Sequence, residues 1–157
     1  MKLSPTRKTD YGIRALLYLA QTLDRSVKAE EVGAEMDIPT SFLRQVLQDL
    51  QRVGMVSSRS GPNGGYLLSK DPEHISILEI VEVLEGSPYI KECALRGGPC
   101  RWEQVCALHW IWGSAQQALI ERLEKATLLD LVQEDKAIKD GTRVAPVDSH
   151  RRINIPT

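Results

Sequence analysis

The stretch between Lys28 and Leu68 constrains the fold more than any other part of this chain. In it, Asp37-Ile38-Pro39 interrupts one helical pattern, and Thr40 is placed to cap the next. The second helix carries an apolar stripe formed by Phe42, Leu43, Val46, Leu47, Leu50 and Val53. Gly54 follows where a glycine commonly ends a helix. Two helices joined by a short break, the second with a polar outer face, are typical of a helix-turn-helix.

A glycine-rich hairpin is predicted directly after the second helix. Met55–Arg59 and Tyr66–Leu68 have the pattern of short strands, and Gly61-Pro62-Asn63-Gly64-Gly65 between them is a tight turn. The phosphate loop of an NTPase is a poor alternative, because its motif is absent and such a loop is followed by a helix, not a strand. A hairpin after a helix-turn-helix predicts the wing of a winged helix.

The polar side chains of this region are candidates to contact double-stranded DNA. Those on the outer face of the second helix can hydrogen-bond base edges or phosphates, and wing glycines let the backbone approach DNA closely. An ordinary solvent-exposed helix face has a similar composition, so it is the hairpin that favours DNA binding. The predicted DNA-binding residues are Lys28, Thr40, Ser41, Arg44, Gln45, Gln48, Arg59, Asn63, Gly64 and Gly65.

Further helices are predicted on both sides of this unit. One covers Thr9–Leu23, with Thr9 or Asp10 as its cap, and another follows a capping box at Ser76 and runs to Glu85. A long helical pattern runs from Trp102 to Lys125. Its small and apolar face comprises Trp112, Ala115, Ala118, Leu119 and Leu123. A small winged domain has little core left to cover such a helix, so we expect it to form a homodimer.

The fold class is therefore mainly α with a small β-hairpin wing, a winged helix-turn-helix domain plus a long dimerisation helix. Thr127 is expected to cap one more short helix, and from Gln133 the chain is charged and without periodicity. The predicted domains are 1–86 as the DNA-binding domain, 87–101 as a cysteine-bearing sensor loop, 102–132 as the dimerisation helix with the short following helix, and 133–157 as a flexible tail.

The composition of the chain excludes few classes of protein. The net charge of −1 does not by itself indicate a nucleic-acid partner, since a local basic patch is what matters. The polar start of the chain has no apolar signal region, and the apolar runs are too short to cross a bilayer. We expect a cytoplasmic protein with no membrane partner. No catalytic triad, nucleotide loop or carboxylate pair is visible, so we expect no enzymatic activity.

All three cysteines, Cys93, Cys100 and Cys106, lie close together with the spacing C-x6-C-x5-C. Zinc sites use closer pairs, and thioredoxin-like proteins use C-x-x-C. A reducing compartment argues against a disulfide framework. Wide spacing with glycines between the thiols suits an iron–sulfur cluster, which needs four ligands. Three small buried side chains without a cofactor are the plainer alternative.

The fourth ligand must then come from another residue. His109 lies three positions after Cys106, a spacing that places both side chains on one face of a helix. Imidazole is an accepted cluster ligand. A carboxylate, or a side chain from a second subunit, would also serve. Taken without the cysteines, His109 would be an ordinary surface or interface histidine.

The order TDYGIRALLYLA, IPTSFLRQVLQDLQRVGMVSS, GPNGGYLLSKDPEHISILEIVEVLEG, three cysteines and ATLLDL resembles the bacterial winged-helix regulators that include IscR, NsrR and RirA. The resemblance covers roughly residues 1–132 in one collinear order. It implies a homodimeric transcription factor that binds operator DNA. It also implies that Cys93, Cys100 and Cys106 hold a cluster that senses iron–sulfur status, nitric oxide, iron or redox state.

The resemblance leaves the cluster type open. Cys106-Ala107-Leu108-His109 is similar to IscR, where a histidine completes a 2Fe–2S site. Thr9-Asp10-Tyr11 is similar to NsrR, where an aspartate of the partner subunit completes a 4Fe–4S site, so Asp10 is a second candidate. The first cysteine gap has one extra residue, and Ser60 stands where many members have arginine.

We expect a repressor of this cluster-binding type. One alternative is a cluster-free regulator of the same fold that senses thiol oxidation or a metabolite. A more remote alternative is a small iron–sulfur redox protein, which the winged-helix pattern argues against.

Overall fold

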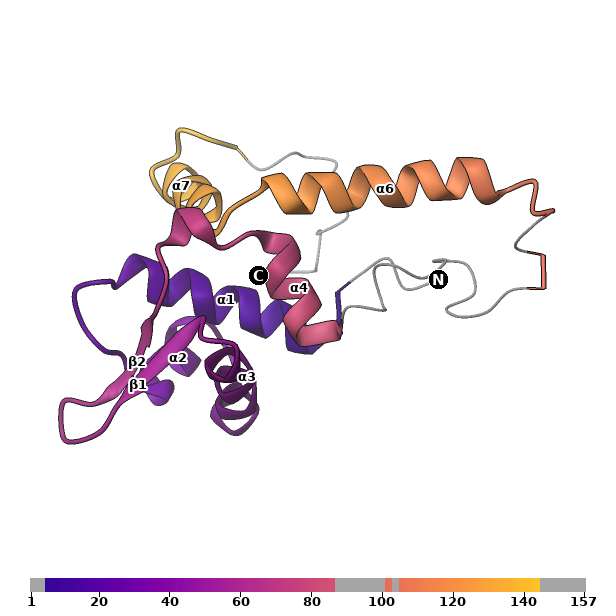
Figure 1. Cartoon of the computed structure of the whole chain (residues 1–157). Coiled ribbons are helices and arrows are strands. Elements are labelled where there is room, and N and C mark those ends of the chain that lie inside the picture. Colours follow the sequence, from indigo (N-terminus) through magenta and orange to yellow (C-terminus); the bar gives the residue numbers. More distant parts are fainter. Residues whose placement is uncertain (1–4, 87–100, 103–104, 145–157) are drawn as a thin grey trace, which may run out of the picture.

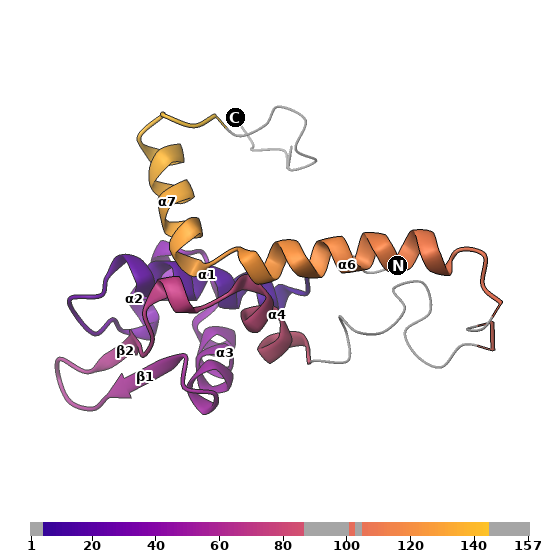
Figure 2. The same cartoon turned by 45° about the horizontal axis from the view of Figure 1, so that its top comes forward.

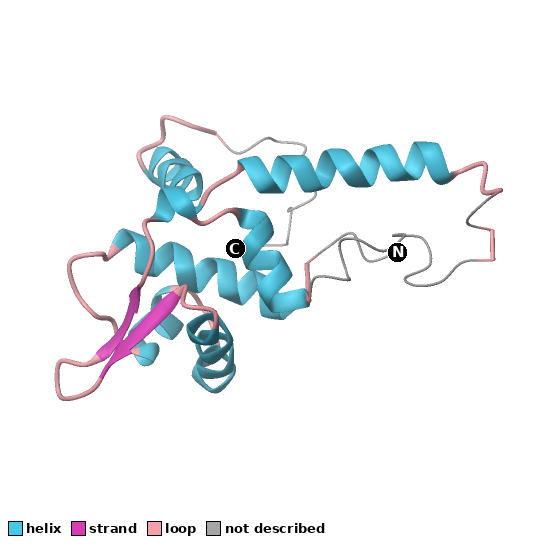
Figure 3. Cartoon of the chain, viewed as in Figure 1, coloured by secondary structure: helices cyan, strands magenta, loops and turns pink. Residues whose placement is uncertain are grey.

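The computed structural model describes residues 5–86, 101–102 and 105–144 (Figure 1). Its elements are α1 (Arg7–Gln21), α2 (Ala29–Glu35), α3 (Thr40–Arg52), β1 (Val56–Arg59), β2 (Gly65–Leu68), the 3-10 helix η1 (Pro72–His74), α4 (Ile77–Glu85), α6 (His109–Lys125) and α7 (Leu128–Lys139). Helices dominate, and the described strands form one two-stranded antiparallel sheet (Figure 3). The predicted fold class is confirmed.

The turn between α2 and α3 forms as the sequence predicts. Asp37 has a φ of +52°, a left-handed conformation that reverses the chain after α2. Gly33 lies against this turn, where an added Cβ would be 2.8 Å from the Ile38 carbonyl oxygen. Pro39 is the cap residue of α3 and Thr40 is the first residue of the helix, so the prediction that Thr40 caps it is wrong. Gly54 follows the helix, as predicted, with a φ of +74°. These conformations set the angle at which α3 leaves the turn.

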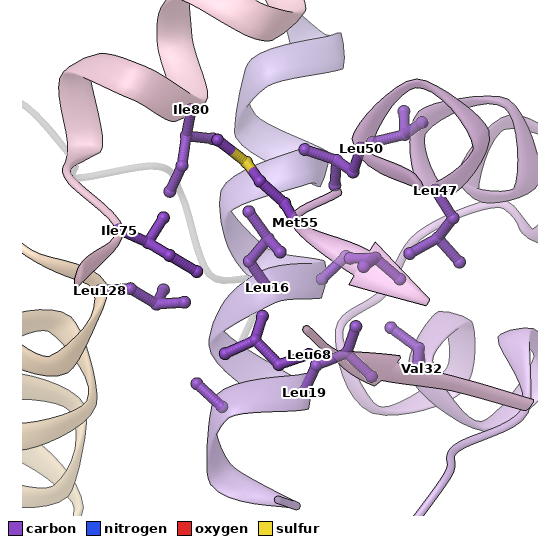
Figure 4. Close-up of a cluster of buried hydrophobic side chains, with 14 of the residues drawn as sticks. Leu16, Leu19, Val32, Leu47, Leu50, Met55, Leu68, Ile75, Ile80 and Leu128 are labelled. Carbon is purple, nitrogen blue, oxygen red and sulfur yellow. The ribbon is translucent and has the colours of Figure 1, made fainter. Parts of the chain in front are cut away.

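The hydrophobic core is built around α1 (Figure 4). Leu16 and Leu19 of this helix are at most 1% exposed and lie among side chains from every neighbouring element of the winged domain. Those neighbours include Val32, Leu47, Leu50, Met55, Leu68, Ile75, Ile80 and Leu128. Because Leu128 belongs to α7, the last described helix packs onto the same core as the first.

The wing, which comprises β1, β2 and their turn, is docked on the loop before α2. Its strands pair from Val56 opposite Leu68 to Arg59 opposite Gly65. The N–H and carbonyl groups of Val27 also bond those of Tyr66, at 2.8 and 2.7 Å. A Cβ on Gly65 would lie 2.5 Å from the Val27 carbonyl oxygen, so only glycine lets the two backbones come this close.

The start of α1 differs from the prediction. The helix begins at Arg7, with Thr6 as its cap residue, and ends at Gln21. Thr9 and Asp10 are therefore inside the helix, and the prediction that one of them caps it is wrong. Thr9 is fully buried and bonds a residue of α4, which its local sequence did not indicate.

The cap of α4 is partly as predicted. The Ser76 hydroxyl accepts a hydrogen bond from the Glu79 N–H at 3.0 Å. The Glu79 carboxylate, which a capping box would direct back to Ser76, instead accepts from Lys70 Nζ at 2.9 Å. Gly86 ends the helix with a φ of +92°.

The two C-terminal helices also differ from the prediction. α6 begins at His109 and not at Trp102, and α7 continues to Lys139, past Gln133 where we expected a tail. α7 starts with a capping box between Thr127 and Asp130. Its later turns are held by tertiary contact with α1, where Gln21 Nε2 donates to Asp135 Oδ2 at 2.6 Å. A contact of this kind gives the sequence no helical periodicity, so the sequence did not indicate that the helix continues. The rest of the predicted tail, 145–157, lies outside the described residues.

α6 is the least covered helix of the described chain. It contacts α4 near its carboxyl end, and its amino-terminal half extends away from the winged domain (Figures 1 and 2). None of its residues is buried. Among the described residues, no helix has the length and apolar character needed to cross a membrane.

Candidate nucleic-acid interface and sensor segment

The outer face of α3 is polar and accessible. Ser41, Arg44, Gln45 and Gln48 are exposed, whereas Leu43, Val46, Leu47 and Leu50 on the opposite face are fully buried. Thr40 is half-buried because its hydroxyl lies against Gly33 in the turn. The buried stripe therefore fixes which α3 side chains are open to solvent. α3 and the wing lie on the same side of α1, opposite α7 (Figures 1 and 2).

The wing presents Arg59 and Asn63, both exposed. Gly64 and Gly65 are half-buried, and a Cβ on Gly64 would lie 2.3 Å from the Arg59 carbonyl oxygen. These two glycines are thus required by the wing's own closure, which is a structural reason besides the predicted approach to DNA. The Ser26 hydroxyl donates to the Asn63 carbonyl at 2.8 Å and ties the turn to the loop before α2.

A three-residue cluster that the sequence did not indicate supports this loop. Glu31 of α2 accepts hydrogen bonds from the Tyr18 hydroxyl at 2.9 Å and from both terminal nitrogens of Arg25. The Arg25 guanidinium lowers the pKa of Glu31, while burial and the neighbouring Glu31 carboxylate raise the pKa of Tyr18. The cluster holds α1, α2 and the loop that carries Val27. Lys28, the cap residue of α2, is exposed beside it.

Two cationic side chains near α3 already have acidic partners. Arg44 Nη2 lies 2.5 Å from Glu30 Oε1 of α2, and Lys8 Nζ of α1 lies 2.7 Å from Asp49 Oδ2 of α3. The hydrogen bond from Lys8 lowers the pKa of Asp49 below its ordinary value. The sequence placed Arg44 on the outer face correctly, but its pairing with Glu30 depends on the crossing of two helices.

The predicted cluster ligands are only partly within the described chain. Cys93 and Cys100 lie outside it. Cys106 is a free, half-exposed thiol, and His109 is exposed. The prediction that both share a helix face is wrong, because α6 begins at His109. They share a turn instead, closed by a hydrogen bond of 3.0 Å from the His109 N–H to the Cys106 carbonyl.

Asp10 lies on α1, with a side chain that is 46% exposed and paired with Arg14 at 2.7 Å. Arg14 also donates to the Met36 carbonyl at 3.2 Å, at the carboxyl end of α2. The amino-terminal end of α6 is far from α1 in both views (Figures 1 and 2). Within the described ranges, no three His, Cys, Asp or Glu side chains are gathered as a metal site.

A partly buried contact joins α1 to the end of α4, just before the predicted sensor loop. Glu85 Oε1 accepts from the Thr6 N–H at 2.8 Å and from the Thr9 hydroxyl at 2.5 Å. Burial opposes ionisation of Glu85, but these hydrogen bonds outweigh it and lower its pKa. Thr9 and Glu85 are far apart in sequence, so local reasoning could not pair them.

The apolar face predicted on α6 is largely open to solvent. Of its residues, Ala115, Ala118 and Leu119 are exposed, Leu119 by 42%, whereas Trp112 is half-buried and Leu123 packs on the winged domain. Two further apolar side chains, Leu108 just before α6 and Ile111 on it, are 52% and 67% exposed. Trp110, 82% exposed, stands beside the ring of His109 at 5.7 Å between centroids.

Comparison with known proteins identifies relatives over nearly the whole described chain. The family model Rrf2, described as an iron-dependent transcriptional regulator, matches residues 5–134. An HTH-type transcriptional regulator of Aquifex aeolicus is 33% identical over 124 residues, which cover 78% of this chain and 86% of that protein. The HTH-type transcriptional regulator IscR of Escherichia coli strain K12 / DH10B is 30% identical over 147 residues, which cover 93% of this chain and 90% of that protein.

A solved structure has the same fold. CymR, the global cysteine regulator of B. subtilis, superposes with a TM-score of 0.72 at 24% identity, over 84% of this chain and 98% of that chain. At this level of identity the likeness concerns the fold alone.

Proposed function

Because this chain belongs to the Rrf2 family of transcriptional regulators, we propose that it senses iron–sulfur status, nitric oxide, iron or redox state through a cluster held by its three cysteines. Its relatives are transcription regulators and not enzymes, and its winged helix is of the DNA-binding kind. The observation that carries the finer proposal is the gathering of Cys93, Cys100 and Cys106 directly before α6.

DNA is contacted by α3 and the wing. The exposed Ser41, Arg44 and Gln45 enter a major groove, while Arg59 and Asn63 hold the adjacent backbone or minor groove. A dimer presents two copies of α3, so the operator is a palindrome with half-sites one helical turn, or a multiple of it, apart. We expect repression of the genes behind it.

The dimer forms through α6. Ile111 and Leu119 of α6, and Leu108 just before it, are exposed in the single chain, and a second α6 would cover them. Leu119→Lys should convert the dimer to a monomer in sedimentation velocity and weaken operator binding, because two half-sites no longer act together. Gln117→Lys adds the same charge on the opposite face of α6, beside Glu121, and should leave the dimer intact. A dimeric Leu119→Lys protein would contradict the assignment.

The described ligand candidates fit an iron–sulfur cluster chemically. Cys106 offers an accessible thiol outside any disulfide, and His109 offers an imidazole in the same turn. Thiolates with one imidazole or carboxylate are known cluster ligand sets, and a bound cluster supplies reactivity toward oxidants and nitric oxide. We favour His109 as the fourth ligand, since the Asp10 carboxylate is held by Arg14 and would have to come from the partner chain.

The Glu85 contact offers a route from the cluster to DNA. Glu85 is the last residue of α4, and its hydrogen bonds with Thr6 and Thr9 tie the base of the sensor loop to α1, which supports α3. Gain or loss of the cluster would act on this contact and change the separation of the two α3 helices. A coupling of about 1–3 kcal/mol would change DNA affinity by one or two orders of magnitude.

Purification without oxygen tests the cofactor. The protein should contain iron and sulfide and absorb visible light, and Cys→Ser at 93, 100 or 106 should abolish all three signals. Resonance Raman spectra of His109→Ala beside Asp10→Ala would identify the fourth ligand, the correct substitution being the one that alters the iron–ligand bands. A colourless protein with one zinc per chain would refute the cluster.

A thiol sensor is the second candidate, and the free, half-exposed Cys106 favours it. In that case peroxide alone would change operator affinity in metal-free protein. Cys106→Ser would then abolish the response, and the other two cysteines would not matter.

A further inference from the structure

The ion pair between Glu30 and Arg44 lies on the surface that we propose faces DNA. Arg44 is on the outer face of α3, and its side chain is 58% exposed; Glu30, on α2, is 61% exposed. An exposed pair contributes little to folding. A carboxylate beside a helix that binds DNA also repels the phosphates. The position of Glu30 is therefore better explained by a role in recognition than by a role in folding.

The geometry leaves most of the Arg44 guanidinium available. The contact uses one nitrogen, Nη2, at 2.5 Å from Glu30 Oε1. Among the described residues, no other hydrogen bond of Arg44 is found, so Nε and Nη1 keep their donors. Nη2 itself carries two N–H groups, and the one that Glu30 does not take forms a parallel pair with an N–H of Nη1 or with that of Nε. Arg44 can therefore still donate two parallel hydrogen bonds to guanine O6 and N7.

Glu30 is ionised at neutral pH. A hydrogen bond from its own main-chain N–H, followed by the bond from Arg44, lowers its pKa below the ordinary value. Its negative charge therefore stays beside Arg44 throughout the range in which DNA binding is measured. A phosphate that approaches Arg44 must compete with this carboxylate.

We propose that Glu30 is a specificity-determining residue, which orients Arg44 toward base edges and suppresses its contacts with phosphates of unrelated sequence. The proposal rests on the proposed function, in which α3 faces DNA. Glu30 acts through Arg44 and is a positioning residue, because no direct contact of its carboxylate with DNA is needed.

Two DNA probes separate this role from a general effect of charge. One is a 30-base-pair duplex of random sequence, and the other is a duplex of that length selected from a random pool by the wild-type protein. Fluorescence anisotropy over a range of KCl concentrations gives both affinities for the full chain. Glu30→Gln should bind the random duplex about three- to tenfold more tightly at low salt, with a steeper salt dependence. The selected duplex should gain less, so that the ratio of the two affinities falls.

Glu73→Gln is the matched control, since Glu73 is an exposed glutamate of η1, on the α7 side of the molecule, and loses the same charge. It should leave the ratio unchanged. In an Arg44→Ala background, Glu30→Gln should no longer change the ratio, because the side chain it orients is gone. Circular dichroism of each variant checks that the helices are intact.

An equal effect of Glu30→Gln and Glu73→Gln, or an effect that persists without Arg44, would overturn the role of Glu30 while leaving DNA binding in place. Failure of the wild-type protein to bind or select any duplex would overturn the proposed function, and this inference with it.

Glu30→Asp provides a second test. It keeps the negative charge but shortens the side chain, so that the carboxylate no longer reaches Arg44. Binding to the random duplex should therefore stay weak, while affinity for the selected duplex falls.

Discussion

The winged domain and α6 carry similar apolar side chains but place them in opposite surroundings. Leu16 of α1 is 0% exposed and touches a core that draws on α3, the wing, α4 and α7. Leu119 of α6 is 42% exposed, and α6 has no buried residue at all. A domain with such a core can fold as one chain, whereas most of α6 has only its own backbone and the solvent to stabilise it. The first region defines the fold, and the second carries the surface through which we propose that the dimer forms.

The largest expected effect is on the core. Leu16→Ala should lower the free energy of unfolding by about 2–5 kcal/mol, because it removes buried methyl groups and leaves a cavity. Leu119→Ala should cost less than about 1 kcal/mol in the dilute protein, since little of that side chain is buried in the single chain. Urea denaturation at several protein concentrations measures both. Equal losses at the lowest concentration would remove the contrast between the two regions.

Substitution of alanine at two glycines should change the free energy of unfolding in opposite directions. Gly65→Ala should destabilise by about 1–3 kcal/mol, because its Cβ would be 2.5 Å from the Val27 carbonyl oxygen and would push the wing off its loop. Gly113→Ala on α6, where nothing lies within 4 Å of the added Cβ, should stabilise by about 0.5–1 kcal/mol through helix propensity. Thermal unfolding measures both. A neutral Gly65→Ala would mean that the wing is not held by Val27.

A smaller effect is expected at the contact between α1 and α4, the helix on which α6 packs. Thr9→Val keeps the size of the buried side chain but removes the hydroxyl that donates to Glu85, and should cost about 1–2 kcal/mol. Thr9→Ser keeps the hydroxyl and should preserve the operator response to cluster loss, which Thr9→Val should weaken. If both variants respond like the wild type, the Glu85 contact is structural only.

The smallest effect is the dependence of stability on pH. The folded-state pKa of Glu85 is lowered, so its contribution is fully present above the unfolded-state pKa of about 4.3. That contribution is lost as the pH falls through the lower, folded-state value. The free energy of unfolding should therefore decrease on acidification from about pH 5 to pH 3. Glu85→Gln should make this decrease in the free energy of unfolding smaller. The change should be less than the loss in the free energy of unfolding that Thr9→Val causes at neutral pH. An unchanged pH profile in Glu85→Gln would show that Glu85 is not ionised in its contact.

Much of the surface that we propose faces DNA could be predicted because its signals are local. Asp37-Ile38-Pro39, the apolar stripe of α3 and the glycines of the wing each act through neighbours a few residues away. The exposed positions of Ser41, Arg44 and Gln45 follow from that stripe. The start of α6 could not be read in the same way, since its helical pattern continues upstream of His109 with no cap to end it.

The sequence alone determined the order of elements, the polar face of α3 and the collection of thiols before a long helix, because periodicity, turn residues and spacing are properties of neighbouring residues. Tertiary structure decided the pairs that link distant segments: Thr9 with Glu85, Val27 with Tyr66, and Glu30 with Arg44. It also decided how far α7 extends, since its last turns are stabilised by α1. The physical reason is that a hydrogen bond or ion pair across the fold depends on how helices cross, and the residues that make it carry no sign of their partner.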